Sequence, residues 1–124
     1  MLQLAKETAD ACAESLKRPI VMIGGICGKT AQALKEAAFL KETGYDAGLL
    51  SLAALGQESV PELIAHCKAV AEIMPIMGFY LQPAVGGRLL PVDFWRQFAE
   101  IPNVVAIKMA PFNRYYTIDV MRGV

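Results

Sequence analysis

Four short apolar runs recur along the chain at nearly constant spacing, and this repeat limits the folds that the sequence can adopt. They are residues 20–24, 47–51, 76–80 and 104–108. Successive runs begin about 28 residues apart, the length of one strand–helix unit. Each run is apolar on both faces, as expected for a parallel strand that is covered by helices. The repeat therefore predicts buried parallel strands.

Helical patterns fill the intervals between these runs, at residues 30–43, 60–73 and 92–99. The residues at their boundaries are typical of helix ends: Thr30 can cap the first helix and Gly44 can end it, while Ser59 with Pro61 can open the second. The stripe Phe94, Trp95 and Phe98 is expected to face the core. We predict an α/β fold in which parallel strands alternate with helices.

The two ends of the chain favour one of two parallel folds. Residues 4–16 and 115–124 both read as helix, so the chain begins and stops in mid-repeat. Four strand–helix units make half of an eightfold barrel of ~250 residues. We therefore predict that residues 1–124 form a single segment, half of a TIM (β/α)8 barrel. A complete, small flavodoxin-like binding domain is the alternative.

Composition and charge exclude several classes of partner. The 124 residues are 55% hydrophobic and 19% charged, which is apolar for a small domain and predicts that a partner subunit or further sequence covers part of the surface. Twelve basic and twelve acidic residues give zero net charge without charged blocks, so no nucleic-acid partner is expected. No apolar stretch approaches the ~20 residues of a membrane-spanning helix.

Cysteine and histidine are too few and too scattered for a metal centre. The three cysteines show no Cys-x-x-Cys spacing, and His66 is the only histidine. We expect no metal and no cofactor, and we interpret the cysteines as reduced thiols in a cytoplasmic protein. The charged N-terminal helix does not read as a signal peptide.

Two strand ends carry side chains suited to chemistry. Lys108 closes the fourth apolar run, where a buried amine is costly to leave charged, and a neutral lysine can hold a ketone as a Schiff base. Tyr80 closes the third run. If both point inward, Gly78 and Ala106 leave room below them, and strands ~4.8 Å apart bring the phenol to within one water of the amine. The alternative is that Lys108 extends into solvent and Tyr80 only caps the core.

A glycine-rich segment at residues 24–30 follows a strand and opens a helix, as a phosphate-binding P-loop does. That motif needs a glycine five positions before Gly28, and Ile23 stands there instead. We therefore expect a glycine-rich turn at the catalytic face rather than a nucleotide site.

Four motifs then point to a known family: Arg18-Pro-Ile-Val-Met-Ile-Gly-Gly, Ala69-Val-Ala-Glu, Phe79-Tyr-Leu-Gln-Pro and Ile101-Pro-Asn-Val-Val-Ala-Ile-Lys. Through them the sequence resembles the dihydrodipicolinate synthase / N-acetylneuraminate lyase family over about residues 18–110. The resemblance implies strands three to six of a (β/α)8 barrel, usually in a tetramer. It also implies that Lys108 forms a Schiff base with pyruvate or a related 2-oxo acid, and that Tyr80 shuttles protons.

Departures from the family pattern concern the rest of the site. The threonine/serine motif that grips the substrate carboxylate lies on a strand before this segment, and Ala53 and Ala54 stand where an aromatic pair is expected. Val85 stands where an arginine is often found, with Arg88 three positions on. We assign substrate binding to Gly24, Gly25 and Arg88.

These departures favour a lyase or aldolase of a 2-oxo acid over dihydrodipicolinate synthesis itself. The family's quaternary structure implies a homo-oligomer. The segment made alone is expected to be inactive, and the competing hypothesis is a non-catalytic fragment.

Overall fold

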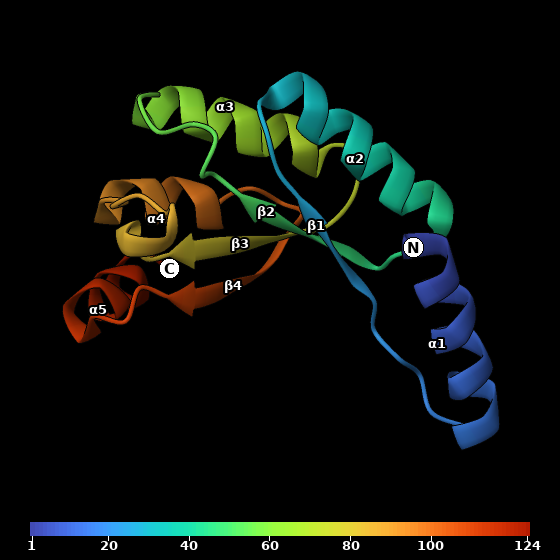
Figure 1. The fold of residues 1–124 in the computed structure, drawn as a ribbon. Coiled ribbons are helices and arrows are strands. Elements are labelled where there is room, and N and C mark those ends of the chain that lie inside the picture. Colours follow the sequence, from blue (N-terminus) through green and yellow to red (C-terminus); the bar gives the residue numbers. More distant parts are fainter.

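The computed structural model describes residues 1–124 as one open sheet with helices packed against it (Figure 1). The strands are β1 (Ile23–Ile26), β2 (Ala47–Ser51), β3 (Ile76–Leu81) and β4 (Val104–Ala110). The helices are α1 (Leu2–Leu16), α2 (Thr30–Thr43), α3 (Val60–Ala71), α4 (Val92–Ala99) and α5 (Arg114–Gly123), with a short 3-10 helix, η1 (Pro83–Val85), after β3. The predicted alternation of parallel strands and helices is confirmed.

Strand order decides between the two parallel folds. Each strand pairs in parallel with the next one along the chain, giving the order β1-β2-β3-β4. Buried residues of α2, α3 and α4 join those of the strands in a single core, and α2 and α3 lie on the same side of the sheet (Figure 1). A flavodoxin-like sheet reverses its strand order and carries helices on both faces. The chain is therefore a section of barrel wall, and the flavodoxin-like alternative is wrong.

Helix boundaries follow from local hydrogen bonds. At the start of α3, the Ser59 amide donates to Oε2 of Glu62 at 2.7 Å, which completes a capping box. Gly44, at a φ of 87°, ends α2 in the left-handed conformation. Thr30 does not cap α2 as predicted, because it is already the first helical residue. Its hydroxyl lies 2.9 Å from Nδ1 of His66 instead.

The first strand lies later than the sequence predicts, at Ile23–Ile26 rather than residues 20–24. Pairing starts where β2 starts, with Ile23 opposite Ala47. Just before it, the Met22 amide donates to Oδ2 of Asp46 at 2.7 Å, and the Asp46 amide donates to the Met22 carbonyl at 2.9 Å. The pairing of β1 with β2 therefore begins where β2 begins, at Ala47, and not at the first apolar residue of the run, Ile20.

The sheet has one covered face and one open face. On the covered face, strand side chains pack against the aromatic stripe of α4, and the α-carbon of Gly78 comes so close that an added Cβ would lie 2.8 Å from the Phe98 ring. The open face is defined by two cross-strand rows. They are Gly25, Leu49, Met77 and Ala106, and nearer the carboxyl ends Ser51, Phe79 and Lys108.

Helix α1 projects away from the sheet (Figure 1) and buries none of its residues. Its first turn is held by Tyr45, whose hydroxyl donates to the Leu2 carbonyl at 3.0 Å. None of the helices combines the length and the apolarity that a bilayer crossing requires.

Candidate active site

Lys108 lies on the open face near the carboxyl end of β4. It pairs with Phe79 of β3, and paired residues on parallel strands point to the same face. Its Nζ lies 4.6 Å from the centroid of the Phe79 ring, within cation–π distance. The side chain is exposed, so the amine can be reached from the open face. This arrangement supplies an accessible amine above an aromatic ring.

Tyr80 points the other way, into the helix layer. It is only 2% exposed, and its ring centroid lies 4.9 Å from that of Trp95 in α4. Its hydroxyl lies 3.5 Å from the Leu90 amide. Burial raises the pKa of this phenol, so the hydroxyl stays protonated near neutral pH and is a weaker acid than a free phenol. The expectation that the phenol lies beside the Lys108 amine is therefore wrong in this structure.

A β-bulge explains the difference. Ile76 pairs with Val104, so a regular ladder would place Tyr80 opposite Lys108 four residues later. The ladder is irregular at this point, and Met77 pairs with Ala106, which leaves Val105 as an extra residue that is 60% exposed. Every later pair is shifted by one, and Lys108 comes to lie beside Phe79.

The three residues assigned to substrate binding lie in different settings. Gly24 is buried, and an added Cβ would lie 2.3 Å from Cδ2 of Leu40, so this glycine permits close packing against α2. Gly25 is on the open face, where an added Cβ would meet no atom within 4 Å. Arg88 is half-buried, and its Nη1 donates to the carbonyls of Leu55 and, at 3.0 Å, Glu58. Arg88 thus fastens the loop after β2.

Two residues of the open face were not predicted as site residues, Ser51 and Phe79. Ser51 pairs with Phe79, which pairs with Lys108, so the three side chains form one row across β2, β3 and β4. Ser51 and Phe79 also line a cavity of about 500 Å³ that extends past Gly25 to Glu36 and Phe39 of α2 and that Lys108 does not line. The position of Ser51 at the end of an apolar run could have marked it as a site residue. Phe79 could not be found in this way, because its place beside Lys108 depends on the bulge.

Other reactive side chains lie apart from this row or are held inert. The Cys27 amide donates to Oε2 of Glu36 at 2.7 Å, and desolvation together with the Glu36 charge raises the pKa of the Cys27 thiol. Burial raises the pKa of the Cys67 thiol to about 12. Both thiols are protonated near neutral pH and are weak nucleophiles. No three His, Cys, Asp or Glu side chains come together as metal ligands would.

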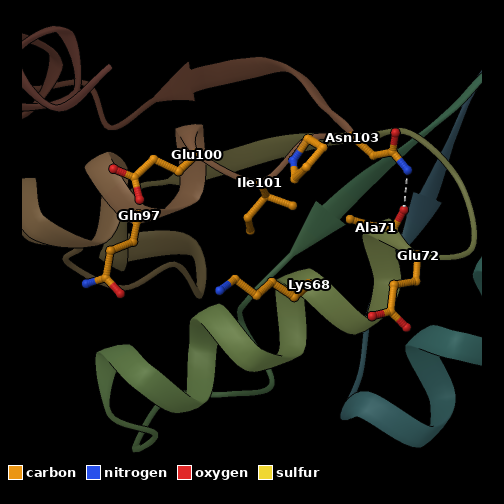
Figure 2. A pocket seen from close by; sticks show the side chains of 8 residues that line it. Lys68, Ala71, Glu72, Gln97, Glu100, Ile101 and Asn103 are labelled. Atoms are coloured by element: carbon orange, nitrogen blue, oxygen red, sulfur yellow. Dashed lines mark hydrogen bonds between the residues drawn. The ribbon is translucent and has the colours of Figure 1, made fainter.

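A second concavity, of about 470 Å³, lies at the opposite end of the sheet, between the last turns of α3 and α4 (Figure 2). Lys68 lines it from α3, Glu72 from the residue that follows α3, and Gln97 from α4. Nδ2 of Asn103 donates to the Ala71 carbonyl at 2.8 Å beside it. The loops there lead into the amino ends of β3 and β4, whereas Lys108 stands near the carboxyl end. This concavity therefore does not belong to the Lys108 site.

Comparison with known families settles what kind of chain carries this arrangement. The profile of the dihydrodipicolinate synthetase family matches residues 2–124. The chain belongs to the dihydrodipicolinate synthetase family. Over 106 residues it is 32% identical to a 4-hydroxy-tetrahydrodipicolinate synthase of Methanosarcina acetivorans, and over 109 residues 31% identical to one of Methanosarcina mazei. These stretches are 85% and 87% of this chain, but only 36% and 37% of the two relatives.

Solved structures of dihydrodipicolinate synthases share the fold. The enzyme of Agrobacterium tumefaciens superposes with a TM-score of 0.70 and 25% identity over 88% of this chain and 37% of its own. The enzyme of Acinetobacter baumannii, solved with pyruvate, gives 0.71 and 24% over 99% and 44%. The four strands and their helices thus correspond to less than half of such a barrel, and the predicted partial (β/α)8 barrel is confirmed.

Proposed function

We propose that the protein to which this chain belongs is a lyase or aldolase that holds pyruvate or a related 2-oxo acid as a Schiff base on Lys108. The observation that carries the proposal is the exposed amine of Lys108 near the carboxyl end of β4. In eightfold barrels this is the face where active sites lie. Membership in a family whose named relatives are 4-hydroxy-tetrahydrodipicolinate synthases supports the same class of chemistry.

The chemistry needs an uncharged amine for its first step. The Nζ lone pair attacks the C2 carbonyl carbon, and loss of water leaves an iminium ion. The iminium withdraws electrons from C3, so that a C3 proton is lost and the resulting enamine carbon can attack an aldehyde. Reversal of these steps cleaves the same bond, and water finally releases the 2-oxo acid.

Phe79 is placed to assist this sequence. An aromatic ring attracts a cation over its face, and the iminium nitrogen carries a positive charge. With Nζ 4.6 Å from its centroid, the ring stabilises the iminium without offering a group that could hydrolyse it. Proton transfer at C3 is not assigned to Tyr80, whose hydroxyl lies in the helix layer.

Reductive trapping tests the proposal. The protein expressed from its natural reading frame is treated with pyruvate and sodium borohydride, and the modified peptide is identified by mass. A three-carbon adduct on Lys108 is expected, and it should be lost in Lys108→Arg but kept in Lys29→Arg, which alters the lysine that precedes α2. An adduct on Lys29 or Lys41, or none with any 2-oxo acid, contradicts the proposal.

The 124 residues expressed alone should differ from the whole protein in both association and activity. The outer edges of β1 and β4 have no partner strand in the sheet order, and the open face has no covering layer. Unpaired edges and exposed apolar surface both promote association. We therefore propose that the isolated chain self-associates and shows no turnover, and that the whole protein is a homo-oligomer. Light scattering that shows a clean monomer with measurable cleavage contradicts the first part.

A further inference from the structure

The loops that follow β2 and β3 both lie at the carboxyl ends of their strands, and Arg88 joins them. Arg88 belongs to residues 82–91, which connect β3 to α4. Its Nη1 donates to the Leu55 carbonyl and, at 3.0 Å, to the Glu58 carbonyl, both in the segment that connects β2 to α3. One guanidinium thus ties together two loops at the edge of the sheet where the proposed chemistry takes place.

The loop after β2 depends on this contact. Apart from the two hydrogen bonds from Arg88, the hydrogen bonds of residues 52–58 join residues no more than three positions apart. A charged donor makes a stronger hydrogen bond to a carbonyl than a neutral one does. Arg88 therefore supplies the only hydrogen bonds that attach this loop to a distant part of the chain.

The loop after β3 is folded so that Arg88 stays close to the end of that strand. The Gly87 amide donates to the Gln82 carbonyl at 3.0 Å, which closes a turn directly after β3. The main chain of Gly87 lies so near the strand end that an added Cβ would overlap the Leu81 carbonyl. Leu90 is 6% exposed, so the chain is anchored on both sides of Arg88.

The Arg88 side chain also fills space beside Phe79. It lines a gap together with Ser51 and Ala53 on the β2 side and Phe79 on the β3 side. The space left in this gap is about 10 Å³, which is room for no more than one water. The gap is on the β2 side of the Phe79 ring, whereas Lys108 is on the β4 side. Without the arginine, the ring has room to turn away from the amine.

We propose that Arg88 is a positioning residue, which holds the loop after β2 against β3 and thereby keeps the Phe79 ring beside the Lys108 amine. It acts through Phe79 and does not contact the 2-oxo acid, a role that differs from the substrate binding predicted from the sequence. The inference rests on the proposed function, in which the ring stabilises the iminium ion on Lys108.

A double-mutant cycle tests whether Arg88 acts through Phe79. Arg88→Gln, Phe79→Leu and the double variant are made in the protein expressed from its natural reading frame. For each, the pyruvate concentration that half-saturates borohydride trapping on Lys108 is measured. An exposed cation–π contact is worth a roughly 2- to 5-fold change in an equilibrium constant, so each single substitution should raise this concentration by about that factor. The double variant should show no further rise beyond that of Phe79→Leu.

Hydrogen exchange of the amides of residues 53–58 gives a second readout, which needs no ligand. Exchange should be faster in Arg88→Gln, because the loop loses its attachment to β3, and should change little in Phe79→Leu. The control is Arg96→Gln. Arg96 is exposed on α4 and its side chain makes no hydrogen bond, so neither the exchange nor the trapping should change.

The outcomes separate the inference from the proposed function. Additive effects of the two substitutions on trapping, or unchanged exchange in Arg88→Gln, contradict the role of Arg88 and leave Lys108 as the Schiff-base lysine. A rise of more than about tenfold in Arg88→Gln that persists in the Phe79→Leu background would mean that the arginine contacts the 2-oxo acid itself. Failure of the unsubstituted protein to form any adduct contradicts the proposed function, and the action of Arg88 through Phe79 with it.

Discussion

The two faces of the sheet differ in what their side chains do. On the covered face, Tyr80, Trp95 and Phe98 are each no more than 2% exposed and pack ring against ring. On the open face, Phe79 is half-buried and lies under a single exposed amine, that of Lys108. Burial on the first face stabilises the fold, while accessibility on the second allows chemistry. Adjacent residues of one strand therefore have unrelated roles.

Removal of the Lys108 amine should have the largest effect. Lys108→Met keeps the bulk of the side chain but cannot form a Schiff base, and loss of a covalent nucleophile lowers turnover on the order of 10⁴-fold or more. Because the side chain is exposed, thermal stability should stay near that of the parent. The control is Lys68→Met beside the concavity of Figure 2, where turnover should not change. Comparable losses in both variants would break the assignment of chemistry to the open face.

Substitution of Phe98 on the covered side and of Phe79 on the open face compares what each contributes to the free energy of unfolding. Phe98→Ala removes a ring that is 1% exposed and should lower the free energy of unfolding by about 3–5 kcal/mol. Phe79→Ala removes the same ring from the open face and should cost about 1 kcal/mol. Urea denaturation of the 124-residue chain, at concentrations where light scattering shows a monomer, measures both. Equal costs would mean that another layer covers the open face in solution.

The free energy of unfolding should also depend on pH, because α3, one of the helices that cover the sheet, contains a buried histidine. His66 is 3% exposed, its Nε2 has no hydrogen-bond partner, and burial lowers its pKa despite the opposing charge of Glu58. Below the unfolded-state pKa of about 6.5, the unfolded chain binds a proton that the folded chain does not. The free energy of unfolding should therefore fall as the pH drops from about 6.5 to the lower folded-state pKa.

His66→Gln is the control for this dependence, because His66 is the only histidine in the chain. Urea midpoints between pH 7 and pH 5 should slope for the parent and be nearly flat for the variant. An equal slope in both would assign the dependence to carboxyl groups instead.

The smallest effect is expected for Tyr80→Phe. The hydroxyl makes only a 3.5 Å contact with the Leu90 amide and lies away from Lys108, so turnover should change by no more than a few-fold. A catalytic proton donor or acceptor would be worth about 10²–10⁴-fold. A fall of that size, with unchanged thermal stability, would show that the phenol reaches the open face after all.

The sequence predicted the elements far better than the relative positions of two side chains. Spacing and helix-end residues are local signals, so the four strands and the helices from Thr30, Val60 and Val92 were predicted to within a few residues. The order of the strands followed from the repeat. What no local signal showed is the extra residue Val105, because a bulge depends on how two strands pair. Because of that one residue, Phe79 and not Tyr80 is the neighbour of Lys108. For the same reason the sequence did not show that Ser51, which pairs with Phe79, lies in the same row as Lys108.

A crystal structure of the borohydride-trapped pyruvate adduct tests the central claim most directly. The account predicts continuous density from Nζ of Lys108 across the face of the Phe79 ring, with the Tyr80 hydroxyl still beside Trp95 and the Leu90 amide. An adduct on another lysine, or one in contact with the Tyr80 hydroxyl, would contradict the separation of packing and chemistry between the two faces.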